Sequence, residues 1–318
     1  MHFGKQILRF IFKPQCVKCG KFGGWLCPDC KNKLIGSLPE CYSCRKISPD
    51  FATHQSCLSA STPFSKVIVC WRYNEIGKNL IAKFKYSYVF QMSETLADLI
   101  ASSSGFSKLI KELSPDLDQA VFTIIPLHIR RQNQRGFNQC DLLANQILAS
   151  IQLTDLQYVP NLLIRRANNE HQAHLDRFQR KSNIKDAFSI NKSALLQLQL
   201  NSRGKNAKQN EAQNRFAFES FKLQKRHRQL PDNKNARNKI QTNFGLKPKK
   251  PQAKTASHLL QQKQNPKTPQ SPSVTKIVVF DDILTTGSTM NEAGRVLRKT
   301  FPQATLIGFC LFRGGRGN

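Results

Sequence analysis

Residues 275–295 read TKIVVFDDILTTGSTMNEAGR, and this stretch decides the fold of the chain. Four apolar residues at 277–280 follow Thr275 and predict a buried parallel strand. We expect Asp281 and Asp282 to end that strand, before a loop of small hydroxylated residues and a helical pattern. Backbone N–H groups at a helix start hold phosphate, and paired carboxylates accept hydrogen bonds from a sugar cis-diol. The stretch therefore predicts a cradle for a ribose 5-phosphate group.

Residues 277–289, IVVFDDILTTGST, resemble the fingerprint with which type I phosphoribosyltransferases bind 5-phosphoribosyl 1-pyrophosphate (PRPP). The resemblance implies that Asp281 and Asp282 bind the ribose hydroxyls and are the candidate catalytic residues, with Mg²⁺ accompanying PRPP. It implies that the loop holds the 5-phosphate through Thr285, Thr286, Gly287, Ser288 and Thr289. The alternative is an ordinary strand-to-helix turn capped by Ser288. The acid pair and the loop hydroxyls in register favour the fingerprint.

The composition points to a charged partner and to a segment that does not pack. The chain has 318 residues, room for two domains, with a net charge of +29 and a mean hydropathy of −0.45. Such charge indicates nucleic acid or a phosphorylated ligand. Residues 189–273 alone hold eighteen Lys or Arg and three acids, about half of the net charge. We expect a disordered basic insertion at 191–273, or alternatively an inert spacer.

The start of the chain does not predict a membrane span. Residues 1–14, MHFGKQILRFIFKP, carry Lys5 and Arg9 inside a short apolar run that lacks a small-residue cleavage site. We expect a short amphipathic helix that packs on the next domain, with membrane-surface binding as the alternative. Because the cysteines lie mostly in CxxC pairs, they indicate metal binding in a reducing compartment. The predicted location is cytoplasmic.

The cysteine spacing predicts structural zinc sites. The first cluster is Cys16, Cys19, Cys27 and Cys30, and the second is Cys41, Cys44, His54 and Cys57. Two such pairs complete a tetrahedral zinc site, and they leave no coordination position open. The zinc ions would hold a small domain that lacks a sufficient core. One zinc remains an alternative, because His54 can also be a polar loop residue, and the pairs can also interleave.

The remaining sequence predicts alternating strands and helices. We expect strands in FSKVIVCWRY, AVFTIIP and ATLIGFCLFRG, at residues 64–73, 120–126 and 304–314. We expect helices in IGKNLIAKFKYSY, with Leu80, Ile81 and Phe84 on one apolar face, in SETLADLIASSS, with Ser93 as its cap, and in QRGFNQCDLLANQILASI, with Cys140 buried. They lie at residues 76–88, 93–104 and 134–151. This alternation predicts an α/β fold. Because strands flank the basic segment on both sides, the insertion interrupts one domain.

The order of these segments is similar to that of the ComF family, bacterial proteins linked to natural competence and DNA uptake. The resemblance covers about residues 10–190 and 274–314, and its most specific motif is RGFNQ at 135–139. It implies a type I phosphoribosyltransferase-like parallel sheet flanked by helices. The implied domains are an N-terminal helix with a zinc ribbon at 1–60, the phosphoribosyltransferase-like domain at 61–190 and 274–318, and the insertion at 191–273.

The same resemblance implies a pyrophosphate pocket. Its backbone would come from the turn Ile125, Pro126, Leu127 and His128, and its positive charge from Lys83, Lys85, Arg130, Arg131 and Arg135. An amide-rich block without an assigned role matches at Arg165, Gln172, Arg180 and Asn183. The chain departs from the family at His54, where a cysteine is usual, in the turn TIIP, where two prolines are common, and at Ala167 and Asn169, where an Arg and a Thr are frequent.

Two functions are compatible with these features. The first is a phosphoribosyltransferase, in which positioning and charge neutralisation help pyrophosphate to leave C1 of the ribose. The second is a non-catalytic nucleic-acid-binding component of the competence machinery, with single-stranded DNA or DNA-uptake proteins as partners. The intact acid pair and phosphate loop favour the first, and the basic charge and zinc ribbons favour the second.

Overall fold

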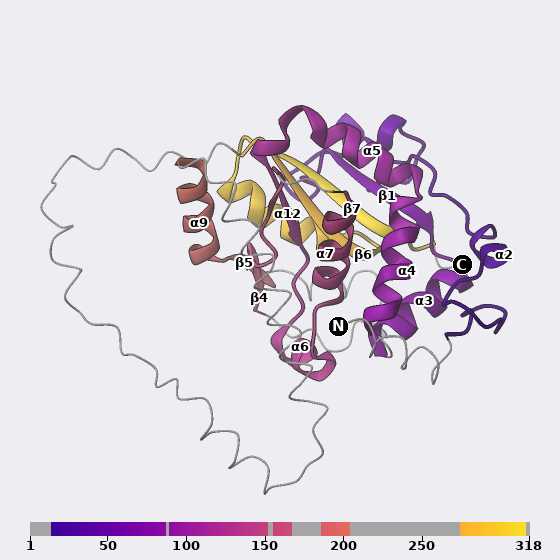
Figure 1. Cartoon of the computed structure of the whole chain (residues 1–318). Helices are drawn as coiled ribbons and strands as arrows, with labels where there is room; N and C mark the ends of the chain where they lie inside the picture. The colour runs from indigo at the N-terminus through magenta and orange to yellow at the C-terminus, as the bar shows by residue number, and fades with distance from the viewer. Residues whose placement is uncertain (1–13, 87–88, 152–154, 167–185, 204–273, 316–318) are drawn as a thin grey trace, which may run out of the picture. The chain divides into compact units, whose positions relative to one another are not determined.

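The computed structural model describes residues 14–86, 89–151, 155–166, 186–203 and 274–315, and Figure 1 shows their arrangement. All of them belong to one compact unit formed by residues 1–207 and 272–318. The expected N-terminal helix, most of the expected insertion and part of the amide-rich block lie outside the described residues: Gln172, Arg180 and Asn183, with the departures at Ala167 and Asn169. The domain boundary at residue 60 stays a prediction.

A five-stranded parallel sheet forms the core, in the order β1-β7-β6-β2-β3. The strands are β1 (Lys66–Arg72), β2 (Ala120–Ile124), β3 (Gln157–Tyr158), β6 (Lys276–Leu284) and β7 (Thr305–Arg313). β2 and β7 are buried over almost their whole length, because helices cover both faces of the sheet. The predicted α/β fold with a mostly parallel sheet is confirmed.

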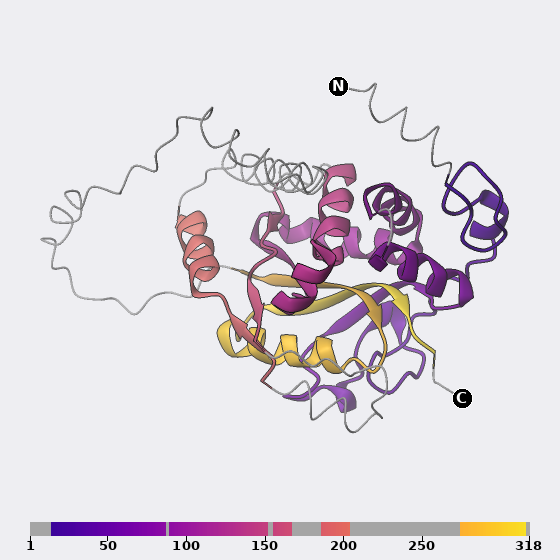
Figure 2. The same cartoon turned by 90° about the horizontal axis from the view of Figure 1, so that it is seen from below.

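Helices lie on both faces of this sheet. In Figure 2, α12 (Ser288–Thr300) lies on one face, and α3 (Glu75–Tyr86), α4 (Val89–Ala101) and α7 (Gln139–Ile151) lie on the other. α5 (Ser104–Leu113) packs beside β1 and leads into the 3-10 turn η3 (Ser114–Gln119). The predicted apolar face of α3 is confirmed, since Leu80, Ile81 and Phe84 are buried.

Two helix boundaries differ from the sequence-based expectation. Ser93 is not an N-cap: it is buried inside α4, because Met92 and Leu96 belong to one apolar stripe that begins before it. RGFNQ separates two helices, since α6 (Ile129–Arg135) ends at Gly136, whose φ of 80° closes the helix. The longer helix α7 begins after that turn and buries Cys140, as predicted.

Strand β6 is longer than the sequence suggested. Asp281 and Asp282 do not end it, because β7 keeps pairing beyond them, with Asp281 opposite Cys310. On the other side of β6 the pairing with β2 stops at Phe280. The acids therefore lie on a strand that extends past one of its neighbours, at the carboxyl end of the sheet.

A small antiparallel hairpin and a further helix follow α7. The hairpin pairs β4 (Leu163–Arg165) with β5 (Phe188–Ile190). Helix α9 (Lys192–Arg203) comes next and buries Ala194 and Leu198. Its sequence, KSALLQLQLNSR, is rich in glutamine but spaces its buried leucine and alanine four residues apart. Regular structure thus continues past residue 191, where we expected the insertion to begin.

The two cysteine clusters lie in a segment that joins the sheet directly. The segment contains α2 (Pro28–Lys31) and the short 3-10 turns η1 (Pro49–Phe51) and η2 (Gln55–Cys57). Its backbone bridges to β1 at Gly36 and Ala52. Phe51 and Phe64 are almost fully buried, so the cysteine segment shares a core with the sheet.

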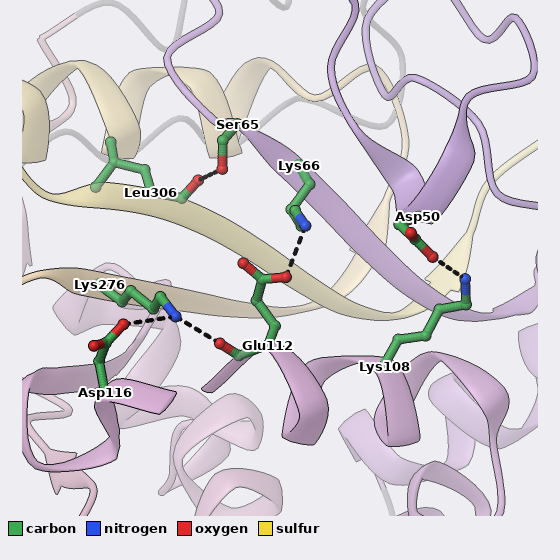
Figure 3. A network of polar contacts seen from close by, with 8 residues as sticks. All are labelled: Asp50, Ser65, Lys66, Lys108, Glu112, Asp116, Lys276 and Leu306. Carbon is green, nitrogen blue, oxygen red and sulfur yellow. Dashed lines mark hydrogen bonds and ion pairs between the residues drawn. The ribbon is translucent and has the colours of Figure 1, made fainter. Parts of the chain in front are cut away.

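Lysines at the amino ends of two strands are held by acids of α5 and η3, as Figure 3 shows. Lys66 Nζ lies 2.8 Å from Glu112 Oε2. Lys276 Nζ donates to the Glu112 carbonyl oxygen at 2.7 Å and lies 2.9 Å from Asp116 Oδ2. This network belongs to the end of the sheet opposite the acid pair, and it fixes the strands from which the site is built.

Candidate functional site

An acid pair and a lysine form the centre of the candidate site. Lys85, on α3, places Nζ 2.9 Å from Asp282 Oδ2, and the two side chains are 22% and 9% exposed. The backbone N–H of Asp282 donates to Asp281 Oδ1 at 2.9 Å. The end of β6 and the last turn of α3 therefore bring two carboxylates and one ammonium group together.

The protonation of the pair follows from this geometry. Burial and, next to it, the charge of Asp282 together raise the pKa of Asp281 to about 8. Burial also raises the pKa of Asp282, but the Lys85 ammonium outweighs this effect, so that the Asp282 pKa falls below its usual value. Near neutral pH, one carboxylate faces Lys85 and the other carboxyl holds a proton. The pair can thus accept and donate hydrogen bonds at once.

The loop after β6 leads directly into α12. Gly287 is the N-cap of α12, with φ of 80°, a conformation that strains other residues. Ser288 is the first residue of the helix, so the alternative of a turn capped by Ser288 is wrong. The Thr286 and Ser288 hydroxyls lie 3.0 Å apart.

The backbone of this loop offers donors. The N–H groups of Thr286 and Gly287 donate no hydrogen bond to any other residue that the structure describes. They lie where the positive end of the α12 dipole adds to them, and Thr289 follows in the first helical turn. An anion with several oxygen atoms matches such a loop.

The turn after β2 contributes less backbone than expected. The Ile125 N–H donates to the Phe280 carbonyl at 2.9 Å, and its own carbonyl accepts from Asn138 Nδ2 at 3.4 Å. Both polar groups of Ile125 are therefore engaged within the fold. Pro126, Leu127 and His128 are half-buried, and His128 caps α6 by accepting from the Arg130 N–H at 3.3 Å.

The predicted cations do not all lie at the acid pair. Lys85 lies at the acid pair, and Arg135 acts on its ammonium electrostatically while donating to Gln139 Oε1 at 3.0 Å. Lys83 is on another face of α3, with Nζ 5.4 Å from the centroid of the Trp25 ring. Residues two apart on a helix do not share a face, which explains why only one lysine reaches the acids. Arg130 and Arg131 lie on α6, exposed and half-buried respectively.

Arg165 joins the site through β4. Its guanidinium carbon lies 5.5 Å from the centroid of the Phe188 ring. Its Nε is buried and donates no hydrogen bond among the described residues. Burial lowers the pKa of Arg165, the charge of Arg131 lowers it further, and Asp281 opposes both. Arg165 therefore lies within electrostatic reach of the acid pair, which the sequence alone did not indicate.

Residues outside our sequence-based site anchor this hairpin to α12. Glu292, which is 7% exposed, accepts from the Asp186 N–H at 2.8 Å and from Arg295 Nε at 2.9 Å. Arg295 Nη2 also lies 2.7 Å from Asp186 Oδ1. Nothing in the local sequence linked Asp186 to α12, because more than a hundred residues separate them.

The last residue of the RGFNQ motif and the cysteine that follows it add two further side chains. The Gln139 side chain helps to lower the pKa of Asp282. Cys140 Sγ lies 3.8 Å from Asp281 Oδ1, and burial raises the pKa of this thiol well above its usual value. Cys140, Asp281 and Asp282 bring their potential ligand atoms within 4.8 Å of one another. The motif itself was the signal that could have placed these residues in the site.

Each cysteine cluster could hold a zinc ion. In both the first cluster (Cys16, Cys19, Cys27 and Cys30) and the second (Cys41, Cys44, His54 and Cys57), the ligand atoms lie within 4.8 Å of one another. The consecutive grouping is therefore confirmed over the interleaved one. Four sulfur or nitrogen donors at such separations fit tetrahedral zinc.

His54 has the geometry of a ligand. Its Nδ1 lies 3.2 Å from Cys44 Sγ, and its Nε2 lies 3.2 Å from the Ile47 carbonyl oxygen. With the proton on Nε2 donated to that carbonyl, Nδ1 keeps its lone pair for a metal. The prediction that His54 stands in for a cysteine fits this arrangement.

The comparison with known proteins gives one relative and no family model. No protein-family model matches the chain. Among the helices that the structure describes, none has the length and apolar character needed to cross a membrane. Competence protein F of Haemophilus influenzae is 30% identical over 188 residues, which cover 57% of this chain and 78% of that protein. Similarity at this level, over most of the length of the relative, shows that the chain belongs to the ComF family.

Proposed function

We propose that the site binds PRPP or a related phosphoribosyl ligand. The 5-phosphate would lie on the loop 285–289, and the ribose hydroxyls would bond to Asp281 and Asp282. One observation carries this proposal: the acid pair with its lysine stands immediately before a loop whose Thr286 and Gly287 N–H groups lie at the start of α12. A ribose 5-phosphate carries both a phosphate, which the loop N–H groups can bind, and a cis-diol, which can donate to the acids.

Magnesium fits the same site. Carboxylate oxygens are the ligands that this hard cation prefers, and Asp281 and Asp282 would supply them. Cys140 is a poor candidate ligand, because burial keeps its thiol protonated. When bound with PRPP, Mg²⁺ neutralises charge on the pyrophosphate. Asp281 has to lose its proton to bind the cation.

The reaction that this arrangement supports is phosphoribosyl transfer. The bond between C1 and the pyrophosphate oxygen breaks with its electron pair on the pyrophosphate, and a nitrogen nucleophile bonds to C1 and releases its proton. The protein positions the ribose and neutralises the leaving group. Lys85 and Arg135 are near the acids, and Arg131 and Arg165 extend the positive charge towards α6 and β4.

A role in competence is the biological setting that the family suggests. The relative from Haemophilus influenzae is named Competence protein F. We infer from this membership that the present chain acts in DNA uptake or natural transformation, in the cytoplasm. Residues 191–273 remain, in this proposal, a basic insertion within the phosphoribosyltransferase-like domain.

A second candidate function is binding of single-stranded nucleic acid. The observation that favours it is the basic helix α6, with Arg130, Arg131 and Arg135, in a chain of net charge +29. Contacts with phosphates make such binding weaken as the salt concentration rises. Fluorescence anisotropy of a labelled oligonucleotide across a salt series tests it. Binding that is absent, or that does not change with salt, counts against this function.

A titration with two sugars tests the primary proposal. Calorimetry with Mg²⁺ should detect PRPP binding, and ribose 5-phosphate should bind more tightly than 2-deoxyribose 5-phosphate by about threefold to tenfold, the value of one hydrogen bond. Equal affinity for the two sugars would contradict the role of the acid pair. Pyrophosphate release with candidate bases and nucleic acids then separates catalysis from binding.

A further inference from the structure

We propose that the second cysteine cluster holds the phosphate loop in shape, with Tyr42 and Arg45 as its positioning residues. Both residues lie in the tight turn of residues 41–45, which contains the two metal-ligand candidates Cys41 and Cys44 and is called the second knuckle below. The consequence for a ligand rests on the proposed phosphoribosyl function. The contacts themselves link a zinc knuckle to a loop more than two hundred residues away.

Arg45 bonds directly to the loop. Its Nη2 donates to the Thr285 carbonyl oxygen at 3.0 Å. Thr285 begins the segment that separates the acid pair from α12. This bond fixes the orientation of the Thr285 carbonyl, and the trans peptide directs the Thr286 N–H to the opposite side, where a phosphate would lie.

The backbone of Arg45 supports a specific role for its side chain. The first cysteine cluster has a corresponding knuckle at residues 16–20, and both knuckles form the same type of turn. The Gly20 N–H donates to the Cys16 carbonyl at 3.0 Å, and the Arg45 N–H donates to the Cys41 carbonyl at 2.9 Å. Gly20 has φ of 75°, and Arg45 has φ of 62°. Glycine adopts this left-handed conformation easily, and arginine does so at a cost. The second knuckle thus carries a long cation at a position where the turn alone favours glycine.

Tyr42 contacts the loop and the helix after it. Its hydroxyl donates to Asn291 Oδ1 at 2.8 Å, and the Asn291 N–H donates to the Gly287 carbonyl at 2.8 Å. The ring lies against Gly287, where an added Cβ would be 3.5 Å from Tyr42 Cδ2. Tyr42 is 3% exposed. The first knuckle has Val17 at the equivalent position, which has no hydroxyl to donate.

A third contact fixes the knuckle to the strand next to the loop. Arg313, at the end of β7, donates from Nε to Glu40 Oε1 at 2.9 Å and from Nη2 to the Tyr42 carbonyl at 3.0 Å. Arg313 lies opposite Leu284 in the sheet, one residue before the loop begins. The second knuckle therefore bonds to the strand beside Leu284, to the loop at Thr285 and to α12 at Asn291. Metal binding at Cys41 and Cys44 would keep these groups in register.

Two variants test this inference while leaving the metal ligands in place. Arg45→Gly gives the second knuckle the residue of the first, so it relieves the left-handed strain and removes the guanidinium. Tyr42→Phe removes one hydroxyl and keeps the ring. We expect unchanged zinc content in both, no loss of thermal stability in Arg45→Gly, and PRPP affinity lower by about threefold to tenfold in each. A residue with a merely structural role would change stability instead.

Hydrogen exchange of the ligand-free protein separates this inference from the proposed function. The amides of Ser288 and Asn291, which donate to Thr286 Oγ1 and to the Gly287 carbonyl, should exchange about threefold to tenfold faster in both variants than in the wild type. If they do, and the wild type does not bind PRPP, the phosphoribosyl function is wrong and the positioning role stands. If exchange and PRPP affinity are the same in all three proteins, the positioning role is wrong, whatever the wild type binds.

Discussion

Lys85 Nζ lies 2.9 Å from Asp282 Oδ2, and this ion pair joins α3 to the carboxyl end of β6. The Lys85 ammonium lowers the pKa of both acids. It keeps Asp282 ionised, and the proton of the pair stays on Asp281. Removal of the ammonium group should therefore change both the stability of the fold and the charge of the site.

Lys85→Met should lower the free energy of unfolding by about 3 kcal/mol, because it leaves a buried carboxylate without its cation. Chemical denaturation at pH 7 measures this value. Lys83→Met is the matched control on the same helix. Because Lys83 is exposed above the Trp25 ring, its loss should be below about 1 kcal/mol. Equal losses in the two variants would contradict the assignment of Lys85 to the acid pair.

Asp281→Asn should stabilise the protein increasingly as the pH rises from 6 to 8. The folded pKa of Asp281 is raised to about 8, so the folded state binds a proton that the unfolded state has already lost. Folding therefore takes up a proton, and the free energy of unfolding of the wild type falls by up to about 1.4 kcal/mol for each pH unit, until the pH passes the folded pKa. Thermal melts of variant and wild type at matched pH give the difference. A difference that stays constant with pH would show that Asp281 is not the protonated member.

Zinc analysis should find two ions in each chain, one for each four-ligand cluster. His54→Ala should reduce the content by one, because the second cluster then has three donors. His54→Cys should keep both ions, since a thiolate replaces the imidazole. Elemental analysis of the purified, dialysed proteins measures this content. Two ions in His54→Ala would mean that His54 is not a ligand.

Gly294→Ala should destabilise the protein, because the new Cβ would lie 2.4 Å from Phe64 Cε2 and 2.6 Å from Pro63 Cγ. The overpacking cost of about 1–3 kcal/mol exceeds the helix-propensity gain of about 1 kcal/mol. Gly36→Ala is the control, with no atom within 4 Å of its added Cβ. Denaturation midpoints compare the two. A stable Gly294→Ala protein would contradict the tight contact between α12 and the segment before β1.

Local spacing predicted the parts of this molecule that depend on local structure. The apolar run 277–280 gave a buried central strand, and Leu80, Ile81 and Phe84 gave the packed face of α3. The CxxC pairs closed into clusters because each turn places two sulfur atoms together. These features need only neighbours in sequence, so a single sequence is sufficient for them.

Tertiary pairing decided the rest. The acids stay within β6 because β7 continues beside them, which the strand's own residues do not encode. Lys85 rather than Lys83 reaches the acids because of how α3 is rotated on the sheet. The bond between Tyr42 and Asn291 joins residues 249 positions apart, so no spacing rule could find it.

Calorimetric titration of PRPP with Mg²⁺ into the wild type and into the Asp281→Asn/Asp282→Asn double variant tests the central proposal most directly. The proposal predicts binding by the wild type and a loss of about tenfold to 100-fold in the variant, because the hydrogen bonds from two ribose hydroxyls to the acid pair disappear. Thermal melts of the variant confirm that it is folded. Equal PRPP affinity in the two proteins, or no binding by the zinc-loaded wild type, would contradict the assignment of the acid pair to a phosphoribosyl ligand.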